Sequence, residues 1–121
     1  MKDYSKMSDF EVNKAVLASL CAYVDVDIVQ HPHRADGVSV GMYRACGDYY
    51  EWFDYCNNPS DAWPLIESNL ICLMADVFCE PQDGGKWIAQ PAYGWQHERV
   101  RNDNPLRAAM IVYLMMKDGE K

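Results

Sequence analysis

The sequence predicts an α+β fold in which three helices flank a mostly antiparallel sheet of about five strands. Three segments begin with helix-capping residues and continue with apolar residues at helical spacing. The segments between them have the alternation and the β-branched and aromatic content of strands. The resulting order, α-β-β-β-α-β-β-α, is typical of helices packed against one sheet. The chain has 121 residues, of which 50% are hydrophobic, so we expect a single domain over residues 1–121.

The first helix is predicted over residues 9–21. Ser8 is placed to accept a hydrogen bond from the third helical amide, and Glu11 is placed to reach back toward Ser8, as in a capping box. Apolar residues that include Val16 and Leu17 then recur at helical spacing. This stripe predicts that the helix covers a sheet.

Three strands are predicted after the first helix. Residues 23–30 alternate between apolar and polar side chains, which is the period of a half-buried strand. Residues 38–46 and 49–56 are strand candidates separated by a short Gly-Asp turn. The last two segments are therefore predicted to form a hairpin.

The second helix is predicted over residues 59–69, because Asn58 is a capping residue and Pro59 suits the first helical position. Strands over residues 70–79 and 86–93 follow, joined by a glycine-containing turn. Residues 94–103 are polar and are expected to be irregular.

The third helix opens at Asn104-Pro105, a capping residue followed by proline. It is apolar on both faces, since Ala109 and Met110 fall on one face and Val112 on the other. A helix of this kind is buried on more than one side, either inside the domain or against a second copy of the chain. A homodimer through the 105–117 helix is therefore one of two expectations.

Three stretches of the sequence resemble one family. They run from Tyr4 to Asn13, from Tyr55 to Ile66 and from Asn104 to Met110, and they occur in the order of the NinX-like phage proteins. These are small accessory proteins of tailed bacteriophages and prophages, related in pattern to the phage ABA-sandwich domains. The resemblance implies helices flanking a sheet, a phage origin, and an accessory role in the cytoplasm of a bacterial host. It supplies no catalytic residue.

Composition disfavours several partner classes. The formal net charge is −7, which repels nucleic-acid backbones, so we expect no nucleic-acid partner. The longest apolar run, residues 108–116, is shorter than a bilayer span, so we expect no membrane insertion. The five cysteines are an odd set without zinc or redox spacing, and we expect most to be reduced core residues.

No catalytic group, metal site or cofactor is predicted. A cysteine nucleophile, Cys46 or Cys56 with His97, lacks a recognisable activating context. Asp25 and Asp27 alternate with apolar residues and are expected to form a solvated strand face. The possible metal ligands show no standard zinc spacing, and they are His31, His33, Cys72, Cys79 and His97.

One group of residues is a candidate ligand site. Arginines cluster around the start of the third helix, where unpaired amides already favour an anion. Aromatic residues just before them are able to stack on a base. The candidate residues are Tyr93, Trp95, His97, Arg99, Arg101, Asn104 and Arg107. In the alternative interpretation Arg107 pairs with Asp103 or a neighbouring acid, and the remaining residues are solvated.

These observations favour a non-enzymatic phage or prophage accessory protein that binds a host or phage protein. The alternative is a host-defence inhibitor that sequesters a small anionic signal of the nucleotide type. An acidic mimic of nucleic acid is a third hypothesis, but the acidic residues alternate with core residues instead of forming a continuous surface row.

Overall fold

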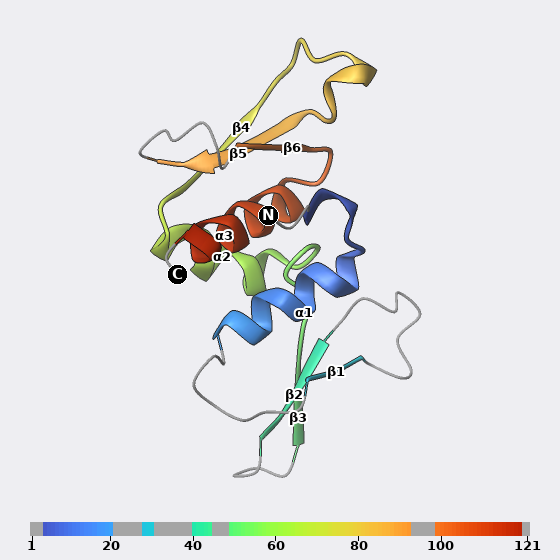
Figure 1. The fold of residues 1–121 in the computed structure, drawn as a ribbon, viewed down its shortest axis with the longest axis vertical. Helices are drawn as coiled ribbons and strands as arrows, with labels where there is room; N and C mark the ends of the chain where they lie inside the picture. The colour runs from blue at the N-terminus through green and yellow to red at the C-terminus, as the bar shows by residue number, and fades with distance from the viewer. Residues whose placement is uncertain (1–3, 21–27, 31–39, 45–48, 93–98, 120–121) are drawn as a thin grey trace.

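The computed structural model describes residues 4–20, 28–30, 40–44, 49–92 and 99–119. Within these ranges the fold is α+β, with helices between two groups of strands (Figure 1). The elements are α1 (Asp9–Leu20), β1 (Ile28–Gln30), β2 (Val40–Arg44), β3 (Tyr49–Phe53), α2 (Pro59–Ser68), β4 (Ile71–Ala75), β5 (Trp87–Pro91), β6 (Val100–Asn102) and α3 (Pro105–Gly119). Short 3-10 turns cover Tyr4–Lys6 and Pro81–Asp83. No helix in the described part of the chain is long and apolar enough to cross a membrane.

The predicted helix starts are confirmed. The Ser8 hydroxyl oxygen accepts a hydrogen bond from the Glu11 amide at 3.1 Å, and Asn58 Oδ1 accepts one from the Ser60 amide at 3.0 Å. Asn104 caps α3 in the same manner. The capping box at Ser8 differs in one detail, because the Glu11 carboxylate accepts from the Ser8 hydroxyl, at 3.3 Å, and not from its amide.

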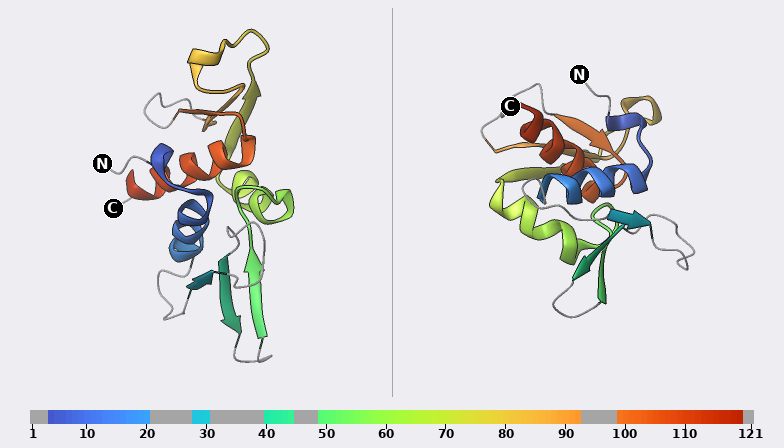
Figure 2. Two further views of the ribbon diagram at one scale, coloured as in Figure 1. Left: turned by 90° about the vertical axis from the view of Figure 1, so that its right-hand side faces the viewer. Right: turned by 60° about the horizontal axis from the view of Figure 1, so that its bottom comes forward.

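The strands form two three-stranded antiparallel sheets, in the orders β1-β2-β3 and β4-β5-β6. The predicted pairing of neighbouring strands is confirmed, but the described strands do not join into one sheet of about five. Helices separate the two sheets, as Figure 2 shows from two further directions. Periodicity predicts which neighbours pair, but it carries no information on whether distant hairpins share a sheet.

Strand β6 was not predicted, because it falls within residues 94–103, which were expected to be irregular. It is three residues long, too short for an alternating pattern to be recognised. Val100 pairs with Ala89 of β5, and its side chain packs against the core. Tertiary packing therefore determines that this segment forms a strand, which the local sequence does not indicate.

Helix α3 is the centre of the core. Residues 108–114 are all buried. On one side α3 contacts β4, β5 and β6, and on the other it contacts α1 and α2. Both apolar faces of the helix are thus covered within one chain, the first of the two arrangements predicted for it. The apolar surface that suggested a homodimer through the 105–117 helix is already used inside the protein.

Several predicted features lie partly or wholly outside the described residues. The strand predicted over residues 23–30 is observed at Ile28–Gln30, and its earlier part, with Asp25 and Asp27, is not described. The Gly47-Asp48 turn, Cys46, His31 and His33 also fall outside the described ranges.

Candidate functional site

Arg107 joins the first and last of the three family-like stretches. Its Nη1 donates to Asp9 Oδ1 at 2.8 Å, and its Nη2 donates to the Met7 carbonyl. The Arg107 side chain is only 11% exposed. The partner acid is Asp9 and not Asp103, which lies closer in sequence. One guanidinium therefore ties the start of α3 to the start of α1, and its charge is matched by a carboxylate.

Asn104 joins the last stretch to the middle one. Its Oδ1 caps α3 by accepting from the Leu106 and Arg107 amides, at 3.0 and 3.2 Å. Its Nδ2 donates to the Cys56 carbonyl at 2.7 Å and to Asn57 Oδ1 at 3.1 Å. Both ends of the amide are satisfied inside the protein, which marks Asn104 as a structural residue.

Asn13 joins the first stretch to the middle one and is fully buried. Its Nδ2 donates to Asp54 Oδ1 at 2.9 Å, and its Oδ1 accepts from the Cys56 amide at 3.0 Å. The Asp54 amide in turn donates to Asp61 Oδ2 at 2.9 Å. We call the seven side chains that link the stretches the junction network: Asp9, Asn13, Asp54, Asn57, Asp61, Asn104 and Arg107. Because its members are bonded to one another or to backbone groups, the network joins segments that are distant in sequence.

Cys56 lies within the junction network and is fully buried. Burial, and next the negative charge of Asp9, raise the pKa of this thiol to about 12. The thiol is therefore protonated at neutral pH, and a protonated thiol is a poor nucleophile. Its partner in the hypothetical catalytic pair, His97, lies outside the described residues.

The described arginines of the candidate ligand site divide between two acids: Arg101 and Arg99 act on Asp76, and Arg107 pairs with Asp9. Arg101 Nη2 contacts Asp76 Oδ2 at 2.9 Å, and its Nη1 donates to the Gly85 carbonyl at 3.3 Å. Arg107 is held by Asp9, on a different element, and Arg99 is exposed. The aromatic candidates Tyr93, Trp95 and His97 are outside the described part of the chain.

Asp76 organises an exposed turn at the end of β4. Its amide donates to the Lys86 carbonyl at 2.7 Å, its Oδ1 accepts from the Phe78 amide at 3.1 Å, and its carbonyl accepts from the Cys79 amide at 3.3 Å. The bond to Arg101, and next that to the Phe78 amide, lower the pKa of the Asp76 carboxyl. We call residues 76–79 the hairpin turn. It is held by the Asp76 carboxylate, which is ionised at neutral pH, together with the backbone hydrogen bonds of Asp76.

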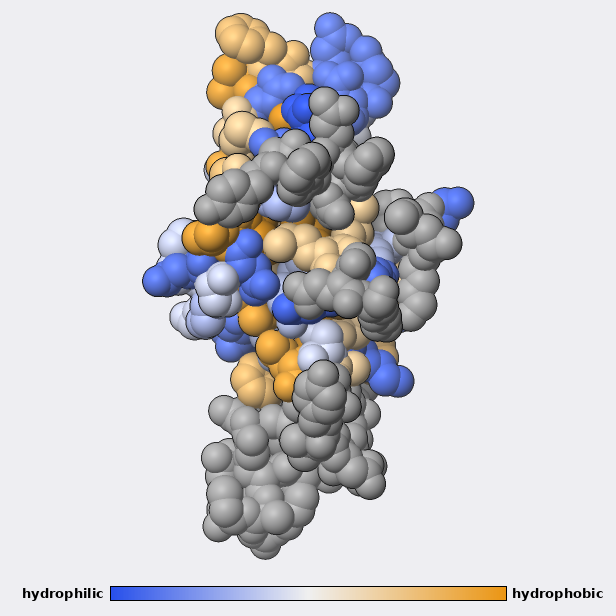
Figure 3. Space-filling model, turned by 60° about the vertical axis from the view of Figure 1, so that its left-hand side comes forward, coloured by the Kyte–Doolittle hydropathy of each residue, from blue (hydrophilic) through white to orange (hydrophobic). Residues whose placement is uncertain are grey.

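The hairpin turn presents two apolar side chains to solvent. Val77 is 81% exposed and Phe78 is 89% exposed. In Figure 3 apolar surface is visible at one end of the molecule beside hydrophilic surface. The strand predicted over residues 70–79 is wrong in its second half, because β4 ends at Ala75 and the apolar residues that follow lie in the turn. The adjacent Asp-Val-Phe-Cys sequence, with an acid able to accept from the amide two residues on, was the available indication of a turn.

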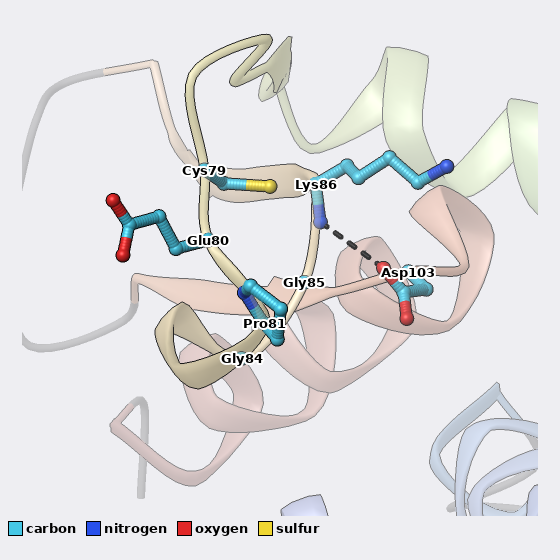
Figure 4. Close-up of a pocket in the computed structure, with 7 residues that line it drawn as sticks. All are labelled: Cys79, Glu80, Pro81, Gly84, Gly85, Lys86 and Asp103. Carbon is cyan, nitrogen blue, oxygen red and sulfur yellow. Dashed lines mark hydrogen bonds between the residues drawn. The ribbon is translucent and has the colours of Figure 1, made fainter.

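An open pocket of about 480 Å³ lies beside the hairpin turn. Its lining residues are Cys79, Glu80, Pro81, Gly84, Gly85, Lys86 and Asp103. Figure 4 shows the Glu80 carboxylate and the Lys86 ammonium pointing in opposite directions, with the Lys86 amide bonded to Asp103 at 3.3 Å. Two carboxylates and one separated ammonium do not make an anion site. Of the candidate ligand residues that the structure describes, none lines the pocket.

Among the described residues, no group of three or more histidine, cysteine, aspartate or glutamate side chains is arranged to hold a metal ion. The described cysteines are free thiols: Cys56, Cys72 and Cys79.

A family model described as bacteriophage P22 NinX matches residues 3–117. This range includes all three stretches that meet in the junction network and the hairpin turn as well. No curated protein and no solved structure matches the chain.

Proposed function

The chain belongs to the bacteriophage P22 NinX family, and we propose that it is a non-enzymatic accessory protein that binds a host or phage protein through the hairpin turn. The observation that carries this proposal is the exposure of Val77 and Phe78, at 81% and 89%. Aromatic residues, phenylalanine among them, are enriched in protein interfaces relative to the rest of the protein surface.

The fixed conformation of the turn supports recognition. Asp76 bonds the backbone of the turn and is bonded by Arg101. A segment that is ordered before it binds loses less conformational entropy on association. The salt bridge is therefore expected to assist binding without touching the partner.

Protein binding is better supported than sequestration of a small anion. Arg101 and Arg107, two members of the candidate ligand site, each hold a carboxylate of the chain itself. An anionic ligand would have to displace these acids. The protonated state of the Cys56 thiol agrees with a non-catalytic role, since its pKa is raised to about 12.

Site-specific photocrosslinking identifies the partner. Phe78 is replaced by the photoreactive analogue p-benzoylphenylalanine, which keeps an aromatic ring at this position, and the protein is irradiated in phage-infected cells. Gln82, an exposed residue of the same hairpin, carries the same analogue as a matched control. We expect a discrete adduct from position 78 and much less from position 82.

Reconstitution then tests the proposal on purified components. The crosslinked protein is purified and titrated with the wild-type chain and with Val77→Ser/Phe78→Ser. Loss of affinity in the double variant supports the proposal. Equal affinity of the two proteins, or stabilisation of the wild-type chain by cyclic or linear nucleotides in a thermal-shift screen, contradicts it.

A further inference from the structure

Among the strands that the structure describes, β4 has a free edge. The sheet order β4-β5-β6 leaves β4 with one strand neighbour, and it lies on the side of the sheet away from β6 (Figure 2, left). The Asp76 amide donates to the Lys86 carbonyl, and the Ala92 amide donates to the Leu70 carbonyl. In an antiparallel ladder hydrogen-bonded and non-hydrogen-bonded residues alternate, so even-numbered β4 residues bond to β5.

The odd-numbered residues of β4 consequently direct their backbone groups outward. Ile71, Leu73 and Ala75 pair with Pro91, Ala89 and Trp87 of β5 at non-hydrogen-bonded positions. Their amides and carbonyls point away from β5, and no partner for them is found among the residues that the structure describes. Within the described part of the chain they form a row of donors and acceptors in strand geometry with no strand partner, which is a template for another strand.

This edge carries none of the devices that normally block pairing. Residues 70–75 read Leu-Ile-Cys-Leu-Met-Ala, without a charged residue or a proline. The opposite edge, β6, is only three residues long and contains Arg101, with Arg99 close by. Short, charged edges resist strand addition, whereas long, apolar, uncharged edges favour it. The two edges of one sheet thus differ in the property that decides pairing.

We propose that β4 pairs with β4 of a second copy of this chain, in antiparallel orientation, with the two-fold axis at Leu73. The outward groups are self-complementary in this register. Leu73 faces the partner's Leu73, and Ile71 faces the partner's Ala75, so every outward amide and carbonyl of the three odd-numbered residues gains a partner. The β4-β5-β6 sheets of the two copies then become one continuous sheet.

The side chains fit the same register. Cys72 lies opposite the partner's Met74 on one face, and all cross-strand pairs from Ile71 to Ala75 are apolar. Met74 is 40% exposed in the single chain, and pairing brings it into apolar contact. No two carboxylates face each other within the ladder, so the net charge of −7 does not oppose it locally.

Substitution of Ala75 separates the edge from the rest of the fold. Ala75→Pro removes an outward amide and places a ring at the edge, but it breaks no bond to β5 because this amide points outward. Ala75→Thr keeps the amide and is the matched control. Sedimentation equilibrium of the full chain is expected to give a dimer for the wild type and Ala75→Thr, and self-association about thirtyfold weaker or more for Ala75→Pro.

A second variant and a second measurement guard against misfolding of Ala75→Pro. Met74→Lys changes a partly exposed side chain and introduces repelling charges near the two-fold axis, so it is expected to weaken the dimer as well. Amide exchange at Leu73 and Ala75 is expected to slow at concentrations where the dimer forms. The inference is overturned if the wild type is a monomer at about 100 µM or if both variants leave the dimer intact. It is also overturned if Val77→Ser/Phe78→Ser loses the dimer. Because residues 77 and 78 lie beyond the ladder, the hairpin-turn proposal stands or falls separately.

Discussion

Replacing Asn13 by alanine probes the junction network at its most buried point. The substitution removes the hydrogen bond from Asn13 Nδ2 to Asp54 and the acceptor of the Cys56 amide, at 2.9 and 3.0 Å. Asn13 and Cys56 are both fully buried, so water does not replace the lost acceptor. Leaving the buried Cys56 amide without an acceptor costs about 1–3 kcal/mol, and losing the bond to Asp54 costs about 1 kcal/mol, so we expect a loss of about 3 kcal/mol.

Urea denaturation followed by tryptophan fluorescence measures this loss as a shift in midpoint at constant slope. Lys14→Ala is the matched control, because Lys14 is the exposed neighbour on the same helix, and it is expected to stay within about 0.5 kcal/mol of the wild type. Asn13→Asp provides a sign test, since it places a carboxylate against Asp54 and is expected to destabilise more at pH 7 than at pH 4. If Asn13→Ala unfolds like Lys14→Ala, the junction network does not hold the three segments together.

Three further predictions concern other parts of the fold. Arg107→Lys loses the two-pronged contact with Asp9 and the Met7 carbonyl and is expected to lower the free energy of unfolding by about 1–3 kcal/mol, and an unchanged urea midpoint would contradict this role. Gly85→Ala is expected to be far more destabilising than Gly84→Ala, because a Cβ at Gly85 would lie 2.3 Å from the Asn102 carbonyl carbon. A Cβ at Gly84 has space, so that substitution is opposed only by the backbone φ of 99°. Equal melting temperatures of the two variants would refute this prediction. The pKa values of Cys56 and Tyr4 are both raised to about 12, so the folded state disfavours loss of these two protons. The stability that the two protonated side chains contribute is therefore present below about pH 9 and is lost as pH rises toward 12. A melting temperature that falls between about pH 9 and 11 would verify this, and a flat profile would exclude it.

The helix starts could be predicted because capping is local. Asn58 and Asn104 each accept hydrogen bonds from amides two or three residues ahead, so a short window of sequence contains the whole interaction. The same holds for the pairing of adjacent strands such as β2 with β3. These features needed no knowledge of the rest of the chain.

The junction network could not be predicted, because its contacts join residues that are far apart in the sequence. Arg107 and its partner Asp9 are 98 residues apart, and the sequence offered nearer acids such as Asp103. The separation of the two sheets depends in the same way on how α1 and α3 stack. Val77 and Phe78 were assigned to a strand because apolar content alone does not distinguish a strand from the turn that ends it.

The affinity of the reconstituted complex tests the central claim most directly. Titration calorimetry compares the wild-type chain with Val77→Ser/Phe78→Ser, while urea denaturation is measured on the same samples. Loss of the two apolar side chains from an interface is expected to weaken binding by about 2–4 kcal/mol, or roughly 30-fold to 1,000-fold, with unfolding unchanged because both side chains are exposed in the free protein. Wild-type affinity in a folded double variant would show that the hairpin turn does not bind the partner.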